Sequence, residues 1–516
     1  MTALTSAQQG PDSPATTEAQ PASNVKLERP APWYTMMGFA FGTFPDSIKN
    51  FAWDLFVLFL YTQVLGLSGT LTGLALLIAL CFDAVSDPYV GFLSDRARNL
   101  RFGRRHTFML LATVPFGLCF YFLFVPPAGL GQWGLFAWLV VFAILSRLTI
   151  TLFAVPVKAV GAELSRDVSV RPKIIGIGTI GLTVARISLP LLAFGFFFLE
   201  SEEYSRGQLN PANYPPFAIT FALAAVVCML ISVATTIKPV LEIERLEPPT
   251  PRPRVGPLEG VKAVISAMTV TPNVRWSLVL AIVVFFSIVS IAILKIHLVT
   301  YLWQTPPDLT KWIISAQYIG TGVGAVILPF VVKTVNRKLC IGAGMVGFTT
   351  LSAVAVLLPV WGFLPPPGTR ELGQVLIGIF TVAGLLLGIY FVAIGSLSAD
   401  VADEHEANTG KRQQALISGF GMFAIKAAGA LMTLVTGIYL DLIAFPKGAP
   451  VGEVPLEKVH ALGYFSAGFC LLGALLVMGV VSRFDVSITK QREINQRLQR
   501  MMKAETKESA AAAASQ

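Results

Sequence analysis

The sequence predicts an all-α integral membrane protein of about twelve transmembrane helices in two six-helix halves. Hydrophobic residues make up 54% of the 516 residues and charged residues only 13%, whereas soluble proteins carry about 25% charged residues. The apolar residues form segments of about twenty, the length that crosses a bilayer as a helix. A polar, proline-rich stretch at residues 238–260 divides these segments into two equal sets.

The predicted spans follow the apolar segments in chain order. In the first half they are residues 45–65, 71–93, 108–125, 135–160, 174–198 and 217–237. In the second half they are residues 276–301, 312–332, 339–364, 375–397, 416–440 and 462–481. The predicted domains are a disordered cytoplasmic tail (1–34), an N-terminal half (35–237), a cytoplasmic linker (238–274), a C-terminal half (275–484) and a cytoplasmic C-terminal tail (485–516).

Loop charges predict the orientation in the membrane. Lysine and arginine gather in the loops after the even-numbered spans, and the loops after spans one and three carry no charge. Cytoplasmic loops are enriched in basic residues, so both termini are predicted to be cytoplasmic. The net charge of +9 has the same explanation, and no nucleic-acid partner is expected. A multi-pass monomer in a plasma membrane, the bacterial inner membrane, is predicted.

The stretch from Asp83 to Arg105 carries the strongest functional signal. Asp83 and Asp87 lie four residues apart within the second span, so on a helix they share one face. A charged side chain at this depth costs at least ~2.5–3.5 kcal/mol, so two of them need a function. Hard cations prefer oxygen ligands, which favours a cation site at depth. The structural alternative is that Asp87 caps a helix kinked by proline.

This stretch resembles the glycoside–pentoside–hexuronide:cation symporter family of the major facilitator superfamily. The family's second helix carries D-x-x-x-D-P-x-x-G, followed by a loop of the form D-R-(several)-R-x-G-(R/K)-(R/K). The matching residues here are Asp83, Asp87, Pro88, Gly91, Asp95, Arg96, Arg101, Gly103, Arg104 and Arg105. YTQVLGLS (61–68) resembles the family's end of helix one, and ADVADEHEANTGKRQQAL (399–416) resembles its loop between helices ten and eleven. The resemblance extends over residues 35–485.

The resemblance implies roles for individual residues. Asp83 and Asp87 would bind the coupling ion, a monovalent metal cation or a proton, together with Thr151 on helix four. Lys426 on helix eleven would link this ion to the substrate. A lysine that merely snorkels to the interface is the alternative for Lys426, although the nearest span end is over a turn away. The cytoplasmic gating loop would comprise Asp95, Arg96, Gly103, Arg104 and Arg105.

Three positions that bind galactosides in this family have changed. In this chain they are Ser47, Ala154 and Thr179, so none of them is an aspartate or an arginine. Asp46 and Asn50 on helix one are therefore candidates for substrate contact. Arg186 lies seven residues after Thr179, on about the same helix face, and could replace the missing arginine. A substrate other than a galactoside is expected.

The predicted function is symport of a sugar or glycoside with Na+ or H+ by alternating access, without any other cofactor. Transport of a lysolipid or another amphiphile is the alternative, because the known sugar contacts have changed and the spans are rich in phenylalanine. An enzyme is not expected, since the spans contain no recognisable nucleophile with a base, metal-ligand cluster or phosphate loop. A receptor without transport is a further alternative, which a flux measurement would separate.

Overall fold

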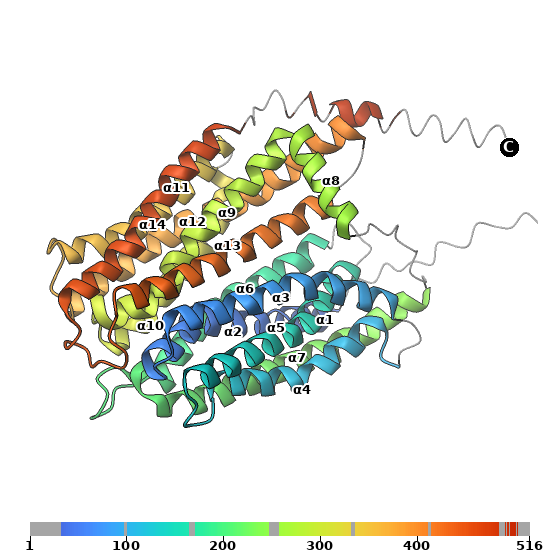
Figure 1. Ribbon diagram of the computed structural model, residues 1–516. Coiled ribbons are helices and arrows are strands. Elements are labelled where there is room, and N and C mark those ends of the chain that lie inside the picture. The colour runs from blue at the N-terminus through green and yellow to red at the C-terminus, as the bar shows by residue number, and fades with distance from the viewer. Residues whose placement is uncertain are drawn as a thin grey trace, which may run out of the picture.

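The computed structural model describes residues 32–97, 101–164, 171–246, 257–331, 336–410 and 414–484, together with parts of 491–503. The described residues form helices and connecting turns, and no strand occurs among them. Figure 1 shows two helical bundles side by side, the first coloured blue to green and the second green to red. The predicted all-α fold is confirmed.

The first bundle contains seven α-helices among the described residues. They are α1 (Trp33–Phe41), α2 (Phe44–Ala52), α3 (Gly69–Arg96), α4 (Arg104–Phe124), α5 (Gln132–Glu163), α6 (Arg171–Leu192) and α7 (Tyr214–Leu246). Short π-helical segments continue two of these helices: η1 (Trp53–Val57) and η2 (Leu60–Val64) follow α2, and η3 (Ala193–Phe197) follows α6. Two 3-10 turns, η4 (Gly207–Leu209) and η5 (Pro211–Asn213), precede α7.

The second bundle follows the same plan. Its helices are α8 (Pro257–Val270), α9 (Pro272–His297), α10 (Pro307–Val331), α11 (Arg337–Val360), α12 (Arg370–Thr409), α13 (Gln414–Leu442) and α14 (Leu456–Ser482). The π-helical segment η6 (Leu298–Leu302) continues α9.

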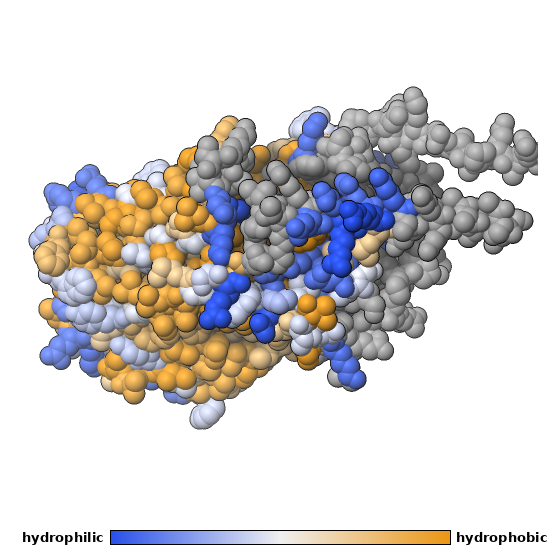
Figure 2. Space-filling view, turned by 90° about the horizontal axis from the view of Figure 1, so that it is seen from above, coloured by the Kyte–Doolittle hydropathy of each residue, from blue (hydrophilic) through white to orange (hydrophobic). Residues whose placement is uncertain are grey.

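Ten helical segments within the described residues are long and apolar enough to cross a membrane. The interrupted run over residues 33–64 and the 25-residue α10 add two more helices of similar length to the bundles. The total agrees with the prediction of about twelve helices. Apolar side chains cover much of the described face in Figure 2, and hydrophilic side chains gather towards its ends. The protein is therefore a multi-pass membrane protein.

Several helices extend beyond the predicted spans into polar sequence. The stretch 399–416, predicted as a loop, is helical as far as Thr409, because no proline or glycine interrupts it before Gly410. Gly410 ends α12 with a φ of 68°, a conformation that glycine adopts without strain. The predicted linker also contains helix, namely the end of α7 and α8. The domain boundaries themselves stay predictions.

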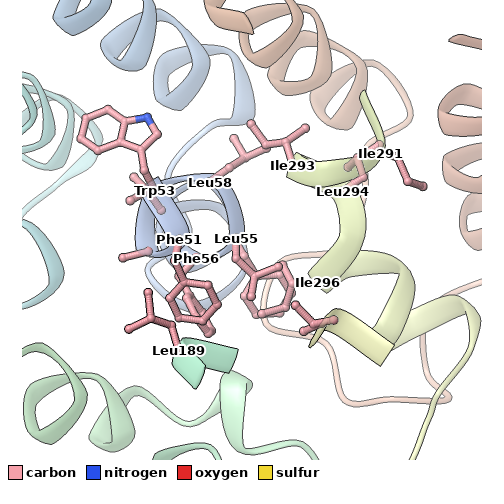
Figure 3. Packing of buried hydrophobic residues seen from close by; sticks show 14 of the residues in the cluster. Phe51, Trp53, Leu55, Phe56, Leu58, Leu189, Ile291, Ile293, Leu294 and Ile296 are labelled. Atoms are coloured by element: carbon pink, nitrogen blue, oxygen red, sulfur yellow. The ribbon is translucent and has the colours of Figure 1, made fainter. Parts of the chain in front are cut away.

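The interior of the first bundle is rich in stacked aromatic rings. Phe56 is fully buried, and its ring centroid lies 4.7 Å from that of Phe198. In Figure 3, Leu58 lies towards Ile293 and Leu55 towards Ile296 of the second bundle. The first helical run therefore lies on the side of the first bundle that packs against α9.

Glycines set the closest helix approach within the second bundle. Gly320 and Gly324 on α10 face Gly384 and Gly388 on α12, each pair spaced by four residues. A Cβ atom at any of these positions would collide with a backbone carbonyl oxygen of the opposite helix. Small residues at this spacing let membrane helices pack backbone to backbone, where dispersion contacts replace the hydrophobic effect.

One end of the molecule is tied across both bundles. We call it the closed end, and it comprises residues 65–68, 125–131, 198–213, 303–306, 361–369 and 443–455. The Asp441 carboxylate on α13 accepts hydrogen bonds from the Ser68 hydroxyl (2.5 Å) and from the backbone N–H groups of Gly69 (2.9 Å) and Thr70 (2.7 Å). A carboxylate of one bundle thus caps a helix of the other.

Further contacts reinforce the closed end. A Cβ atom at Gly69 or Gly437 would collide with the backbone of the other residue, so α3 and α13 touch directly there. The Gln208 side-chain amide donates to the Thr300 hydroxyl at 2.9 Å. The Tyr301 hydroxyl donates to the Gln63 side chain at 3.2 Å. The opposite end, which we call the basic end, carries Arg101, Arg104, Arg105, Arg337 and Lys338.

Candidate functional site

Three helices from both bundles converge on a buried carboxylate. Asp83 lies midway along α3 and is 3% exposed. Arg147 of α5 donates from Nη1 to Asp83 Oδ2 at 3.0 Å, and Lys426 of α13 donates from Nζ to the same oxygen at 2.7 Å. The Thr151 hydroxyl lies 3.2 Å from Asp83 Oδ1. The second bundle therefore contributes a charge to a site built on the first.

Asp87 lies one turn further along α3 and joins the same cluster. Its Oδ1 is 2.8 Å from the Thr151 hydroxyl, and its Oδ2 forms an ion pair with Lys426. The Thr151 hydroxyl has one proton and can donate to only one carboxylate at a time. A proton or a small cation between these oxygens would satisfy the second contact. The structure thus brings together Asp83, Asp87, Thr151 and Lys426, although their roles stay predictions.

Arg147 is the member of this cluster for which the sequence predicted no role. Its guanidinium stacks on the Trp53 ring at 4.3 Å from the centroid, and its buried Nε has no hydrogen-bond partner. Arg147 precedes Thr151 by four residues, so the two side chains share a face of α5. This spacing is the feature of the sequence that could have identified Arg147 as part of the site. We call Asp83, Asp87, Thr151, Arg147 and Lys426 the carboxylate centre, in which two carboxylates face two cations.

The candidates for substrate contact on helix one form a local cluster on α2. The Asn50 side-chain amide donates to Asp46 Oδ2 at 3.2 Å. Lys49, which is 9% exposed, lies 3.4 Å from Asp46 Oδ1. These pairs follow from the spacing of three and four residues on a helix. Asp46 is therefore paired within its own helix rather than across the bundle.

Asp54 differs from Asp46 in having no such partner. It is exposed although the flanking Trp53 and Leu55 are buried. Arg186 on α6 lies within electrostatic range of Asp54, as does Arg147. Neither Asp54 nor Arg186 makes a hydrogen bond or an ion pair with other described residues. Asp54 continues the four-residue spacing of Asp46 and Asn50. This spacing is the feature of the sequence that could have identified Asp54 as a candidate.

The predicted gating loop lies partly outside the described side chains. Those of Asp95 and Arg96 fall outside, so nothing is added to their predicted role. Gly103 precedes α4 with a φ of 77°, a conformation that favours glycine. Arg105 is buried at the start of α4, and Arg104 is half-buried beside it. Both arginines take part in interactions there.

Two helical bundles with a charged centre at mid-depth, built from side chains of both, define a secondary transporter of the major facilitator type. The family model described as "MFS/sugar transport protein" matches residues 38–488. The chain belongs to this family, and the resemblance stated from its sequence is confirmed.

Individual relatives support the same family assignment. The isoprimeverose transporter of Lactiplantibacillus pentosus is 24% identical over 449 residues, which cover 83% of each chain. The sodium-dependent lysophosphatidylcholine symporter 1-A of Danio rerio is 32% identical over 130 residues, which cover 25% of this chain and 24% of the relative. Among solved structures, the xylose transporter XylE from E. coli in its inward-open conformation superposes with a TM-score of 0.58 at 13% identity. That match covers 90% of this chain and 98% of XylE and shows the fold alone.

Proposed function

We propose that the protein is a cation-coupled symporter of a sugar or glycoside. It works by alternating access in a bacterial inner membrane, with both termini in the cytoplasm. Na+ or H+ is the coupling ion. Similarity to an isoprimeverose transporter over 83% of each chain and membership of the sugar transport family support this substrate class.

The observation that carries the proposal is the carboxylate centre. Oxygens of Asp83, Asp87 and Thr151 converge, and the amino group of Lys426 from the second bundle contacts both carboxylates. Charges at this depth are costly unless they are paired or facing water. Carboxylate and hydroxyl oxygens are the ligands that hard cations and protons require.

The coupling step follows from competition between positive charges. A cation or proton that binds between Asp83 and Asp87 takes over charge compensation from Lys426. The lysine is then free to leave the pair, which loosens one tie between the bundles. Substrate binding between the bundles and reorientation follow from this release. Coupling of binding is reciprocal, so the substrate strengthens ion binding to the same degree.

Transport of a lysolipid is the second candidate function. One observation favours it, the partial match to a lysophosphatidylcholine symporter. That match covers a quarter of the chain, whereas the sugar-transporter match covers most of it. The charged side chains of helix one and α6 also favour a polar substrate.

Uptake by the purified protein in proteoliposomes tests the proposal. We expect accumulation of at least one of isoprimeverose, xylose and methyl β-D-glucuronide when a Na+ or pH gradient is imposed. A sugar that accumulates must in turn stimulate ion entry. Dissipating the gradient removes accumulation but leaves slow equilibration. Uptake of lysophosphatidylcholine with no uptake of any sugar in the panel would establish the second candidate instead.

A further inference from the structure

We propose that Asp54, Arg186 and Tyr318 form a clamp that binds hydroxyl groups of the transported sugar, at a place distinct from the family's galactoside positions. The inference rests on the proposed sugar transport and adds the residues that recognise the substrate. Asp54 lies on η1, Arg186 on α6 and Tyr318 on α10. The clamp therefore takes two residues from the first bundle and one from the second.

The exposure of Asp54 is the first observation. Its neighbours Trp53 (8%), Leu55 (6%) and Phe56 (0%) are buried, while Asp54 itself is exposed. A carboxylate in a membrane span does not face lipid, because its charge is too costly there. The charges of Lys49, Arg186 and Arg147 act on Asp54, which places it on the interior side of the helix. Its exposed surface therefore opens between the bundles.

Arg186 provides the second observation. It is half-buried within α6 and has no hydrogen bond or ion pair to any part of the chain that the structure describes. None of its nitrogens belongs to the fully buried atoms that lack a partner, so each nitrogen keeps accessible surface. A guanidinium offers five N–H donors in a planar fork. Asp54 and Arg186 thus lie within electrostatic range of each other without forming an ion pair.

Tyr318 is the third residue of the clamp, and it comes from the second bundle. Its hydroxyl lies within electrostatic range of both Arg186 and Asp54. At a rise of about 1.5 Å per residue, the three residues lie about 15 to 17 Å along their helices from the closed end. That depth is the middle of a hydrocarbon core about 30 Å thick. Residues from three separate helices therefore meet at one level.

The chemistry of the three side chains fits a polyhydroxylated ligand. A carboxylate accepts hydrogen bonds, a guanidinium donates them, and a phenol does either. Adjacent sugar hydroxyls act as donors and acceptors at once, so one sugar satisfies both charges together. The carboxylate centre does not serve this purpose, because its four carboxylate oxygens already contact Arg147, Lys426 or Thr151. Because Asp54 and Arg186 form no ion pair with other described residues, their charges are available to a ligand.

Uptake kinetics of variants test the clamp, with whichever of isoprimeverose, xylose or methyl β-D-glucuronide the wild type transports as the probe. We expect Asp54→Asn and Arg186→Gln to raise KM about tenfold or more, since each removes a charge-assisted hydrogen bond. Tyr318→Phe should raise KM by less, about threefold to tenfold. At saturating sugar, the ion concentration that gives half-maximal uptake should not change in these variants. Asp308→Asn and Arg370→Gln, which break an exposed ion pair near the closed end, are the matched controls and should behave as wild type.

Each outcome has a defined meaning. An unchanged KM in both Asp54→Asn and Arg186→Gln overturns the clamp while leaving the proposed function intact. A fall in the rate with unchanged KM, together with a changed ion dependence, also overturns it, because it would place both residues in the coupling step. Lysophosphatidylcholine uptake without sugar uptake by the wild type overturns the proposed function and the clamp with it. Thermal unfolding in detergent confirms that each variant is folded.

Discussion

Two groups of charged side chains lie near the middle of the membrane, and they differ in how their charges are matched. In the carboxylate centre, Asp83 and Asp87 are in contact with Arg147 and Lys426. In the other group, Asp54 and Arg186 lie within electrostatic range of each other but form no ion pair with other described residues. Paired charges hold helices together, whereas a charge without a partner at this depth is available to a ligand. Under the two proposals, the comparison separates residues that stabilise the fold and couple its bundles from residues that recognise the substrate.

The largest effect is expected from Asp83→Asn. This change leaves Arg147 and Lys426 with one carboxylate between them, and breaking a buried ion pair in this way costs about 3 kcal/mol or more of unfolding free energy. Cation-driven uptake should be abolished, because the ion loses a charged ligand. Gradient-driven sugar uptake and thermal unfolding in detergent measure the two effects.

Asp54→Asn is the matched control for this prediction. It also neutralises one aspartate at mid-depth, but it breaks no ion pair among the residues that the structure describes. Its unfolding free energy should stay within about 0.5 kcal/mol of the wild type. Equal destabilisation by Asp54→Asn and Asp83→Asn would erase the distinction between the two groups. Coupled uptake by Asp83→Asn at the wild-type rate would remove the carboxylate centre from the mechanism.

An intermediate effect is expected from Arg147→Gln. The guanidinium lies 3.0 Å from Asp83 Oδ2 and competes with any ion that approaches this carboxylate. Its removal should lower the half-saturating concentration of the coupling ion about tenfold, at the level of a single charge contact. Ion titration of sugar uptake at fixed sugar concentration measures this shift. If the ion dependence of uptake is unchanged, the role of Arg147 is limited to packing against Trp53.

The smallest effect is expected from Thr151→Val. The change preserves side-chain shape but removes the hydroxyl that touches both carboxylates. The hydroxyl is an uncharged ligand, and the loss of one uncharged contact to the ion costs about 1 kcal/mol, so ion affinity should fall about fivefold. Thr151→Ser keeps the hydroxyl and should retain wild-type affinity. If the serine variant loses as much affinity as the valine variant, the methyl group rather than the oxygen is responsible.

The fold was largely predictable from the sequence, because the length and apolarity of the spans depend on local residues alone. The ends of the helices were not, since hydropathy falls before a helix stops. In α12, charged residues continue the helix to Thr409, and only Gly410 ends it. The closed end was also beyond prediction, because the cap that Asp441 forms on α3 joins residues more than 370 positions apart.

The candidate site was predictable to the extent that residues share one helix. The spacing of Asp83 and Asp87 placed both on one face of α3. The contact of Lys426 with them spans 343 positions and was expected only from the family resemblance. Arg147 went unassigned because an arginine in a span has several explanations. Its contact with Asp83 depends on how α3 and α5 pack against each other, which local sequence does not encode.

α3 and α13 are attached to each other at two levels. At the closed end Asp441 holds the first turn of α3, and about 21 Å further along α3 Lys426 holds Asp83. Under the proposed coupling, an incoming ion would displace only the deeper attachment, because it competes for the same oxygens. The pair of helices would then keep its attachment at one end and be released in the middle, so that a rigid double attachment becomes a pivot. The same seam would thus seal one face of the membrane and set the axis about which the other face moves.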